Sequence, residues 1–176
     1  QVFGVFLDGK NSQLPLVLGS IPKIETNTNS IDESLPSVSI PIDGNTNIEK
    51  AFNFFISPEG GEFTPQQACG MIGNFCVESG ATANRGDINP AAVSGFKDEG
   101  SFGIAQWNPA KKAGDRFGEL QKFAGRINKD YREMETQLRF VKHELETLPY
   151  LGLGQLRGTT TLKDATIVFQ NKYERP

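Results

Sequence analysis

Two segments of the chain carry side chains that could cleave a glycosidic bond. The first, GMIGNFCVESG at residues 70–80, places the carboxylate of Glu78 at the end of an apolar helical pattern. The second, SFGIAQW at residues 101–107, combines glycine with hydrogen-bonding and aromatic side chains. A carboxyl group held against apolar surface retains its proton and can donate it to a leaving sugar oxygen. Together the two segments indicate acid-catalysed cleavage of a bond between sugars.

Glu78 occupies a position where the pKa of a carboxyl group is expected to rise. The apolar residues before it, including Met71 and Ile72, form one stripe of a helix, and Glu78 falls at the border of that stripe. It also lies in the predicted last turn, where the helix dipole disfavours a negative charge. Partial burial and the dipole both favour the neutral form, so we expect Glu78 to serve as a general acid. The alternative is an ordinary glutamate at a helix edge, which helix position alone favours.

The segment SFGIAQW supplies a candidate substrate-binding wall. Ser101 and Gln106 offer hydrogen-bonding groups, while Phe102 and Trp107 offer flat apolar faces. Sugar rings bind through this mixture of stacking and polar contacts. The alternative is that both aromatic side chains belong to the core and that the glycines only form turns.

A second acid is less clearly marked than Glu78. Asp98 and Glu99 directly precede the wall segment and are the candidates for a second catalytic carboxylate, and Asp87 lies in the connecting loop. Each could position a water molecule or stabilise positive charge on the sugar, although a loop acid is more often simply solvated. His143 falls off the apolar face of its predicted helix, which indicates a surface histidine rather than a catalyst.

The composition excludes several other classes of protein. The chain has 176 residues, a net charge of −3 and 13 phenylalanines, which suffice for one packed domain. It shows no basic stripe for nucleic acid, no apolar run long enough to cross a membrane and no signal peptide. One histidine and two cysteines argue against a metal site, and we expect no cofactor. Cys69 and Cys76 are predicted to be buried thiols, because their separation along one helix excludes a disulfide.

The elements that position these residues are predicted to be mainly helical. Residues 1–24 contain two short strands, at 2–7 and 14–18, and residues 25–47 have the composition of a polar linker. Residues 48–176 are predicted to form a mainly α domain with an irregular or β-like insertion at about 81–107. Five helices are expected in this domain. The first spans 48–55, the second runs from a capping box of Thr64 and Gln67 to Gly80, and the third lies around 117–123. The fourth runs from the cap Asp130 to Pro149, and the last begins at about Thr161.

The motifs of this domain resemble a known family. The stretches AFNFFISPEGGEFTPQQACGMIGNFCVESG, INPAAV, GSFGIAQW and FQNKYERP are similar to those of the phage tail lysozyme family. That family belongs to the lysozyme superfamily, near the goose-type lysozymes and lytic transglycosylases. Over residues 48–176, the resemblance implies a lysozyme-like fold, Glu78 as general acid, Gln106 in the substrate groove and a structural turn at Asn89–Pro90. It does not fix the second carboxylate.

The amino-terminal stretch carries a separate resemblance. VFGVFLDGKNSQLPLVLGSIPKIE is similar to the end of the OB domain in baseplate hub proteins of contractile-tailed phages, which join an OB domain, a lysozyme and a trimeric spike. This implies that residues 1–24 are the terminal strands of an incomplete OB-like domain. It also implies a location in the virion tail, with baseplate or tail-spike subunits as partners and a homotrimer as the assembly. The chain, which starts at Gln1, is then a piece of a larger protein.

These observations lead to one main hypothesis and two alternatives. The main hypothesis is a tail-associated hydrolase that cuts the β-1,4 bond between N-acetylmuramic acid and N-acetylglucosamine of bacterial peptidoglycan during infection. The first alternative is a lytic transglycosylase, in which a single glutamate acts as acid and then as base and leaves an anhydro-muramic end. The second is a non-catalytic structural component of the baseplate hub.

Overall fold

The fold is mainly helical, as the sequence predicted. The computed structural model describes residues 2–6, 15–20, 42–80, 86–94, 100–110 and 114–174. Near the amino end, strands β1 (Val2–Phe6) and β2 (Pro15–Ser20) pair antiparallel, which confirms the two predicted strands within a residue or two. The turn between them and most of the predicted linker lie outside the described residues. Strand β1 lies beside helix α2.

Helix α1 (Asn47–Ile56) opens the helical domain with a capping box. The Thr46 side chain accepts a hydrogen bond from the Glu49 backbone, and the Glu49 side chain accepts one from the Thr46 backbone. These bonds satisfy backbone donors that the first turn of a helix leaves free. Most of the apolar face predicted for this helix is buried. Phe54 is buried as well, and Phe52 is only partly buried.

Helix α2 (Pro65–Glu78) is the central helix of the domain and carries Glu78 as its last residue. The predicted capping box of Thr64 and Gln67 is confirmed, and Gly80 turns the chain away in the left-handed conformation, with φ of +72°. The side of α2 at Gly70 lies so close to α6 that a Cβ there would come 2.8 Å from the Cβ of Ala165. Only a residue without a side chain permits this approach, which anchors the helix rigidly.

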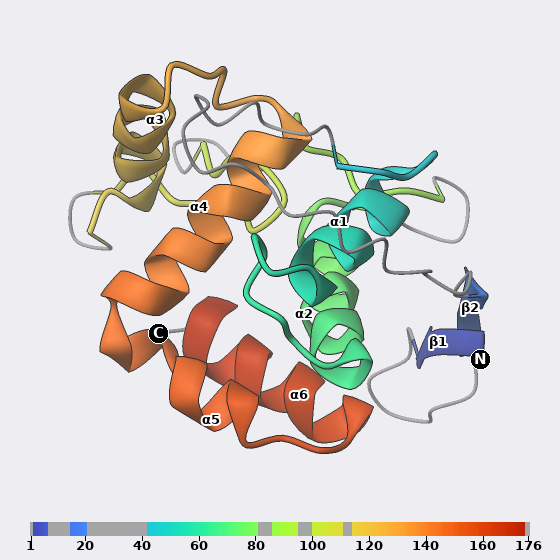
Figure 1. Cartoon of the computed structure of the whole chain (residues 1–176). Coiled ribbons are helices and arrows are strands. Elements are labelled where there is room, and N and C mark those ends of the chain that lie inside the picture. The colour runs from blue at the N-terminus through green and yellow to red at the C-terminus, as the bar shows by residue number, and fades with distance from the viewer. Residues whose placement is uncertain are drawn as a thin grey trace, which may run out of the picture.

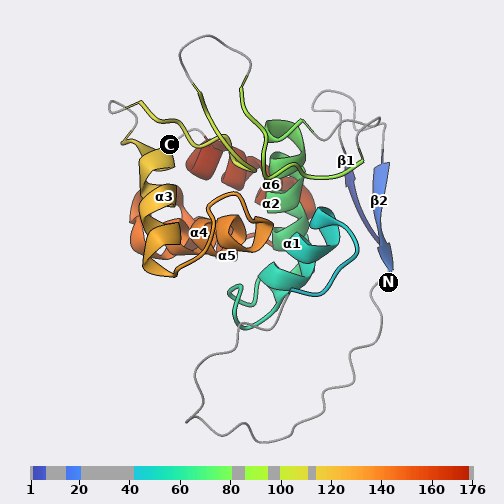
Figure 2. The ribbon, with the colours of Figure 1, turned by 90° about the horizontal axis from the view of Figure 1, so that it is seen from above.

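The carboxyl half of the domain contains helices α3 (Arg116–Arg126), α4 (Met134–Thr147), α5 (Leu153–Arg157) and α6 (Leu162–Phe169), a 3₁₀ turn η2 (Pro149–Leu151) and a final π-helical turn η3 (Gln170–Glu174). Figures 1 and 2 show α3 and α4 on the opposite side of the domain from the strands β1 and β2. Among the described residues, no helix combines the length and the apolar character needed to cross a membrane.

One predicted boundary is wrong, and its correction has a local cause. The helix expected to start after Asp130 begins instead at Met134, with Glu133 in the cap position. The Asp130 side chain accepts a hydrogen bond from the backbone of Arg132 at 2.9 Å and so forms a separate turn. Tyr131 then packs against the rings of Phe102 and Phe117, which holds this turn outside the helix. The helix α6 does begin near Thr161, as predicted, and Thr161 is its N-cap residue.

The predicted irregular insertion is confirmed where it is described. Single bridges join Val93 to Phe102 and Phe102 to Trp107, and the described residues of this insertion contain no longer strand. The side chain of Gln137 on α4, which is fully buried, holds this region in place. Its amide group donates to the carbonyl of Pro90 at 2.8 Å, and its carbonyl oxygen accepts from the backbone of Ile104 at 3.0 Å.

Candidate active site

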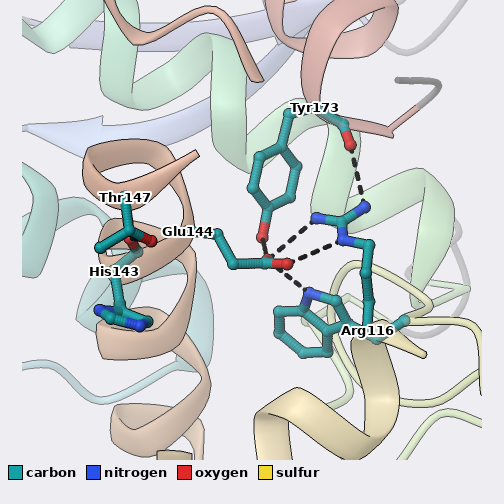
Figure 3. Close-up of polar contacts among 6 residues, drawn as sticks. Arg116, His143, Glu144, Thr147 and Tyr173 are labelled. Carbon is teal, nitrogen blue, oxygen red and sulfur yellow. Dashed lines mark hydrogen bonds and ion pairs between the residues drawn. The ribbon is translucent and has the colours of Figure 1, made fainter. Parts of the chain in front are cut away.

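A buried carboxylate, Glu144 on α4, organises the polar centre of the domain. Its side chain is only 3% exposed and accepts four hydrogen bonds. Trp107 Nε1 donates at 2.9 Å, Arg116 donates through Nε at 2.8 Å and Nη2 at 2.9 Å, and the hydroxyl of Tyr173 donates the fourth. Figure 3 shows the Glu144 carboxylate between Tyr173 and Arg116. The centre therefore ties the wall segment, α3 and η3 to α4.

The charge states in this centre follow from its burial. Burial alone lowers the pKa of Arg116, but Tyr173 and Glu144 outweigh it, so the pKa of the guanidinium is raised overall and it stays cationic. Burial raises the pKa of the Tyr173 phenol well above its usual value, and the negative Glu144 adds to this. Tyr173 therefore remains a neutral donor. A buried ion pair offsets its desolvation cost only when such hydrogen bonds accompany it.

Arg116 also fixes the backbone of η3. Its Nη1 donates to the carbonyl of Tyr173 at 3.1 Å, and its guanidinium lies 4.6 Å from the centre of the Tyr173 ring. The Tyr173 ring in turn stacks on Phe169 at 4.5 Å between centroids. These contacts hold the residue that follows, Glu174, in one place.

Glu174 is a second acidic group in this region. The residue as a whole is partly exposed, yet its Oε1 is buried and has no hydrogen-bond partner among the described residues. Burial raises the pKa of its carboxyl well above the usual range, and the charge of Glu78 raises it further. Arg116 acts in the opposite direction, and Glu144 adds a smaller increase. The structure thus brings Glu174 within electrostatic range of Glu78.

Glu78 lies at the boundary between core and solvent, where the helical pattern predicts it. It is partly buried, between Val77, which is 68% exposed, and Ser79, which is buried. The Ser79 hydroxyl accepts a hydrogen bond from the backbone of Asn89 at 3.1 Å, which ties the end of α2 to the following segment. Glu78 is therefore attached to a fixed backbone while its side chain lies partly in contact with water. Its catalytic role stays a prediction.

The aromatic residues of the wall segment have a different role from the predicted one. Trp107 has no exposed surface and Phe102 is buried against Phe117 and Tyr131, so neither presents a face on which a sugar could stack. Their proposed substrate contacts are corrected here, in favour of the alternative that both belong to the core. Trp107 can be buried because its indole N–H donates a hydrogen bond to the buried Glu144.

The polar residues of the wall segment are held by the backbone. Ser101 is buried, and its backbone donates to the Ser94 hydroxyl at 3.2 Å. Gln106 is partly buried in the left-handed conformation, and its amide nitrogen donates to the carbonyls of Ala92 and Gly103 at 3.3 and 3.0 Å. The amide of Gln106 thus stabilises the segment itself. Its predicted place in the substrate groove stays a proposal.

The remaining acidic candidates divide between a structural residue and positions outside the described structure. Asp87 accepts hydrogen bonds from the backbones of Asn47 and Ile48 at 2.8 and 2.9 Å, so it caps the start of α1. Asp98 and Glu99, predicted as the second carboxylate, lie outside the described residues.

The structure also shows the burial and contacts of the histidine and the two cysteines. His143 is partly buried and stacks on the ring of Phe123 at 5.1 Å. Cys69 and Cys76 are buried and free, as predicted, and burial raises the pKa of each thiol to about 11. Both therefore stay neutral thiols at physiological pH. Within the described residues, no group of histidine, cysteine and acidic side chains is arranged to hold a metal ion.

Three residues of this site were not predicted: Arg116, Glu144 and Glu174. A signal existed for Glu144, because it lies three and four positions after Val141 and Phe140 and therefore on the apolar face of α4. An acid on such a face needs a buried partner. Glu174 belongs to the quoted FQNKYERP stretch, but its proximity to Glu78 depends on how α2, α4 and η3 pack.

Comparisons with known proteins cover the same part of the chain. A family model described as phage tail lysozyme matches residues 46–176. No curated protein matches the chain, and no solved structure matches it. Glu78, Glu174 and the centre around Glu144 all lie within the matched residues.

Proposed function

Because this chain belongs to the phage tail lysozyme family, we propose that it hydrolyses the β-1,4 bond between N-acetylmuramic acid and N-acetylglucosamine, with Glu78 as the general acid. The family comprises lysozyme-like enzymes that act on peptidoglycan and are associated with the phage tail. The particular bond and the role of Glu78 are the parts proposed here.

The position of Glu78 is the observation that carries the proposal. Helix α2 is buried along most of its length and capped at its start, and Ser79 fixes its end. A partly buried carboxyl on a rigid support is what proton donation to a bound substrate needs, because the support sets its geometry in advance. A second carboxyl, that of Glu174, interacts electrostatically with Glu78.

The reaction proposed for Glu78 has two parts. The Glu78 carboxyl gives its proton to the bridging oxygen as the bond between this oxygen and the anomeric carbon breaks, so Glu78 becomes a carboxylate and the sugar an oxocarbenium-like cation. A water molecule then attacks the anomeric carbon and gives up a proton to the carboxylate beside it, which we propose is Asp98 or Glu99. Gln106, Asp98 and Glu99 remain our proposals for the groups that position this water.

The first test is the loss of activity in Glu78→Gln. Glutamine has nearly the same shape as glutamate but carries no acidic proton, so the release of dyed fragments from purified peptidoglycan should fall by about 100-fold or more. Glu59→Gln, which makes the same change at an exposed position, should keep wild-type activity. Equal activity of Glu78→Gln and wild type would remove Glu78 from the mechanism. If the wild type were inactive as well, the chain would be a structural component.

The product of the reaction separates hydrolysis from transglycosylation. Hydrolysis adds a water molecule and leaves a reducing N-acetylmuramic acid end, whereas transglycosylation leaves an anhydro end that is lighter by the mass of one water. Mass spectrometry of digested peptidoglycan should show reducing ends. Anhydro ends in the wild-type digest would replace the hydrolase assignment by the transglycosylase one while leaving Glu78 as the acid.

The assembly in the tail is a further part of the proposal. We propose that residues 1–24 form the end of an OB-like domain, that residues 25–47 link it to the enzyme, and that the protein works as a homotrimer with baseplate or spike subunits. The pairing of β1 with β2 is compatible with this arrangement. Light scattering of the protein after size-exclusion chromatography should give the mass of a trimer, and a monomer mass for the full-length protein would contradict it.

A further inference from the structure

Three glutamates from three different elements interact with one another or with one arginine in this domain. They are Glu78 at the end of α2, Glu144 on α4 and Glu174 on η3, and Arg116 on α3 is the cation near Glu174. A cluster with more negative than positive groups in a place of low polarity cannot hold every carboxyl in its charged form. The question is which of the three keeps a proton.

The hydrogen bonds of Arg116 point to Glu174. Arg116 uses Nε and Nη2 for the two oxygens of Glu144, and Nη1 for the carbonyl of Tyr173. Glu144 also receives the donors of Trp107 and Tyr173. The buried Oε1 of Glu174 receives none from the described residues. An ionised carboxylate in this position would lack donors to stabilise its charge. A neutral carboxyl carries no charge and does not need them to the same extent.

We propose that Glu174 and Glu78 together hold one exchangeable proton, and that Glu174 is a positioning residue which keeps this proton available to Glu78 as the pH rises. The inference rests on the proposed role of Glu78 as general acid. It adds a second acidic residue to the site, at a position separate from Asp98 and Glu99.

The charged groups that face Glu174 agree with this proposal. Glu78 and Glu144 both disfavour a negative charge on Glu174, and Arg116 favours one, but burial is the largest influence and opposes the charge. On its own element, the neighbouring Tyr173 is held neutral by burial. The other titratable side chains on η3 and on its neighbours η2 and α6 are exposed: Lys172 on η3, Tyr150 on η2, and Lys163 and Asp164 on α6.

The exchange conserves protons and charge. When the proton moves from the Glu174 carboxyl to the Glu78 carboxylate, Glu174 becomes the carboxylate and the pair keeps a charge of minus one. This redistribution is an equilibrium between two sites whose charges influence each other, so it requires no direct hydrogen bond between them. In the singly protonated pair, a constant fraction therefore carries its proton on Glu78. Without Glu174, protonation of Glu78 falls continuously once the pH exceeds its own pKa.

The first arm of the test measures protonation without substrate. In the full chain labelled with ¹³C at the glutamate carboxyls, one signal should titrate well above the usual range of glutamate. Glu174→Gln should remove that signal, and Glu78→Gln should move its midpoint to lower pH, because the neighbouring charge is gone. A Glu174 signal that titrates in the ordinary range, or one that Glu78→Gln leaves in place, would overturn the inference.

The second arm measures kcat/KM on soluble peptidoglycan fragments against pH. The ratio of wild type to Glu174→Gln should stay near one at acid pH and rise at alkaline pH, by up to about tenfold per pH unit. Glu174→Asp keeps a titrating carboxyl and should recover part of the alkaline activity. Glu59→Gln serves again as the exposed control and should follow the wild type at every pH.

The outcomes separate this inference from the proposed function. If Glu78→Gln is inactive but the ratio for Glu174→Gln does not change with pH, Glu78 remains the acid and the inference fails. The inference also fails if Glu174→Asp and Glu174→Gln lose activity equally at all pH values, since that result indicates a purely structural residue. If Glu78→Gln is fully active, the proposed function fails as well. Circular dichroism and thermal unfolding of each variant show whether the fold is retained.

Discussion

Glu144 and Glu174 are both acidic residues with oxygens shielded from water, and they differ in what those oxygens meet. The carboxylate of Glu144 accepts four hydrogen bonds, two of them from a guanidinium. The buried Oε1 of Glu174 meets no donor among the described residues, and of the two acidic groups that act on this carboxyl, Glu78 has the larger effect. The first carboxylate has donors for both of its oxygens, while the surroundings of the second favour a retained proton.

The same type of side chain therefore serves two purposes in one domain. A buried carboxylate supplied with enough donors holds other elements together and has no capacity left for chemistry. A carboxyl without such donors is costly to ionise, and strongly perturbed groups of this kind cluster at functional sites. Three variants test the comparison, and their expected effects decrease in the order given.

The largest effect is expected for Glu144→Ala. The substitution leaves the buried Arg116 without its carboxylate, and breaking a buried pair in this way costs about 3–5 kcal/mol. The free energy of unfolding in urea measures the loss. Glu146→Ala removes an exposed acid from the same helix, where it pairs with Lys142, and should change stability by less than about 0.5 kcal/mol. Equal stability of the two variants would show that the centre around Glu144 is not a structural one.

A smaller effect is expected for Tyr173→Phe. Phenylalanine fills nearly the same volume but gives no hydrogen bond to Glu144, so the loss should be about 1.5–3 kcal/mol, the usual contribution of a hydrogen bond to a charged group. Because Arg116 and Trp107 still donate to Glu144, the loss should stay below that of Glu144→Ala. An unfolding midpoint equal to that of the wild type would mean that the hydroxyl adds nothing to this centre.

The smallest effect, and one of opposite sign, is expected for Glu174→Gln. The folded protein holds the Glu174 proton to a higher pH than the unfolded chain, whose glutamate pKa is about 4.3. The contribution of Glu174 to the free energy of unfolding is therefore largest below the unfolded pKa. It decreases as the pH rises toward the folded pKa and stays constant above the folded pKa. Glutamine does not titrate, so the free energy of unfolding of Glu174→Gln does not decrease in this way. The variant should match the wild type near pH 4 and become more stable than the wild type as the pH rises.

Urea unfolding of wild type and Glu174→Gln at several pH values measures this gap. It should widen by less than about 1.4 kcal/mol per pH unit, the limit for one proton. A gap that is constant with pH would contradict the raised pKa of the Glu174 carboxyl in the folded protein.

The sequence predicted the parts of this fold that depend on neighbouring residues. The capping box of Thr64 and Gln67, the helix end at Gly80 and the helix start near Thr161 were confirmed, because each depends on residues within a few positions of one another. The start of α4 was predicted wrongly for a non-local reason. Tyr131 packs against rings from two other segments, and no local pattern contains that contact.

The site was predictable only in part, for the same physical reason. The border position of Glu78 follows from helical periodicity, and its partial burial is confirmed. The burial of Trp107 was not expected, because its partner Glu144 comes from another helix. Glu174 was missed altogether, since its closeness to Glu78 arises from packing between distant elements. The predicted roles of Glu78, Asp98, Glu99 and Gln106 remain predictions.

The attachment of η3 to α3 and α4 also has a consequence for the order of events during synthesis. Helix α2, with Glu78, leaves the ribosome long before residues 170–174, which form the turn that carries Tyr173 and Glu174. Until that turn docks, Glu144 and Arg116 lack one of their anchors and Glu78 has no acidic neighbour on η3. Contacts between such distant residues form late in folding. A nascent chain therefore carries Glu78 without its neighbour Glu174 until η3 has been synthesised and has docked.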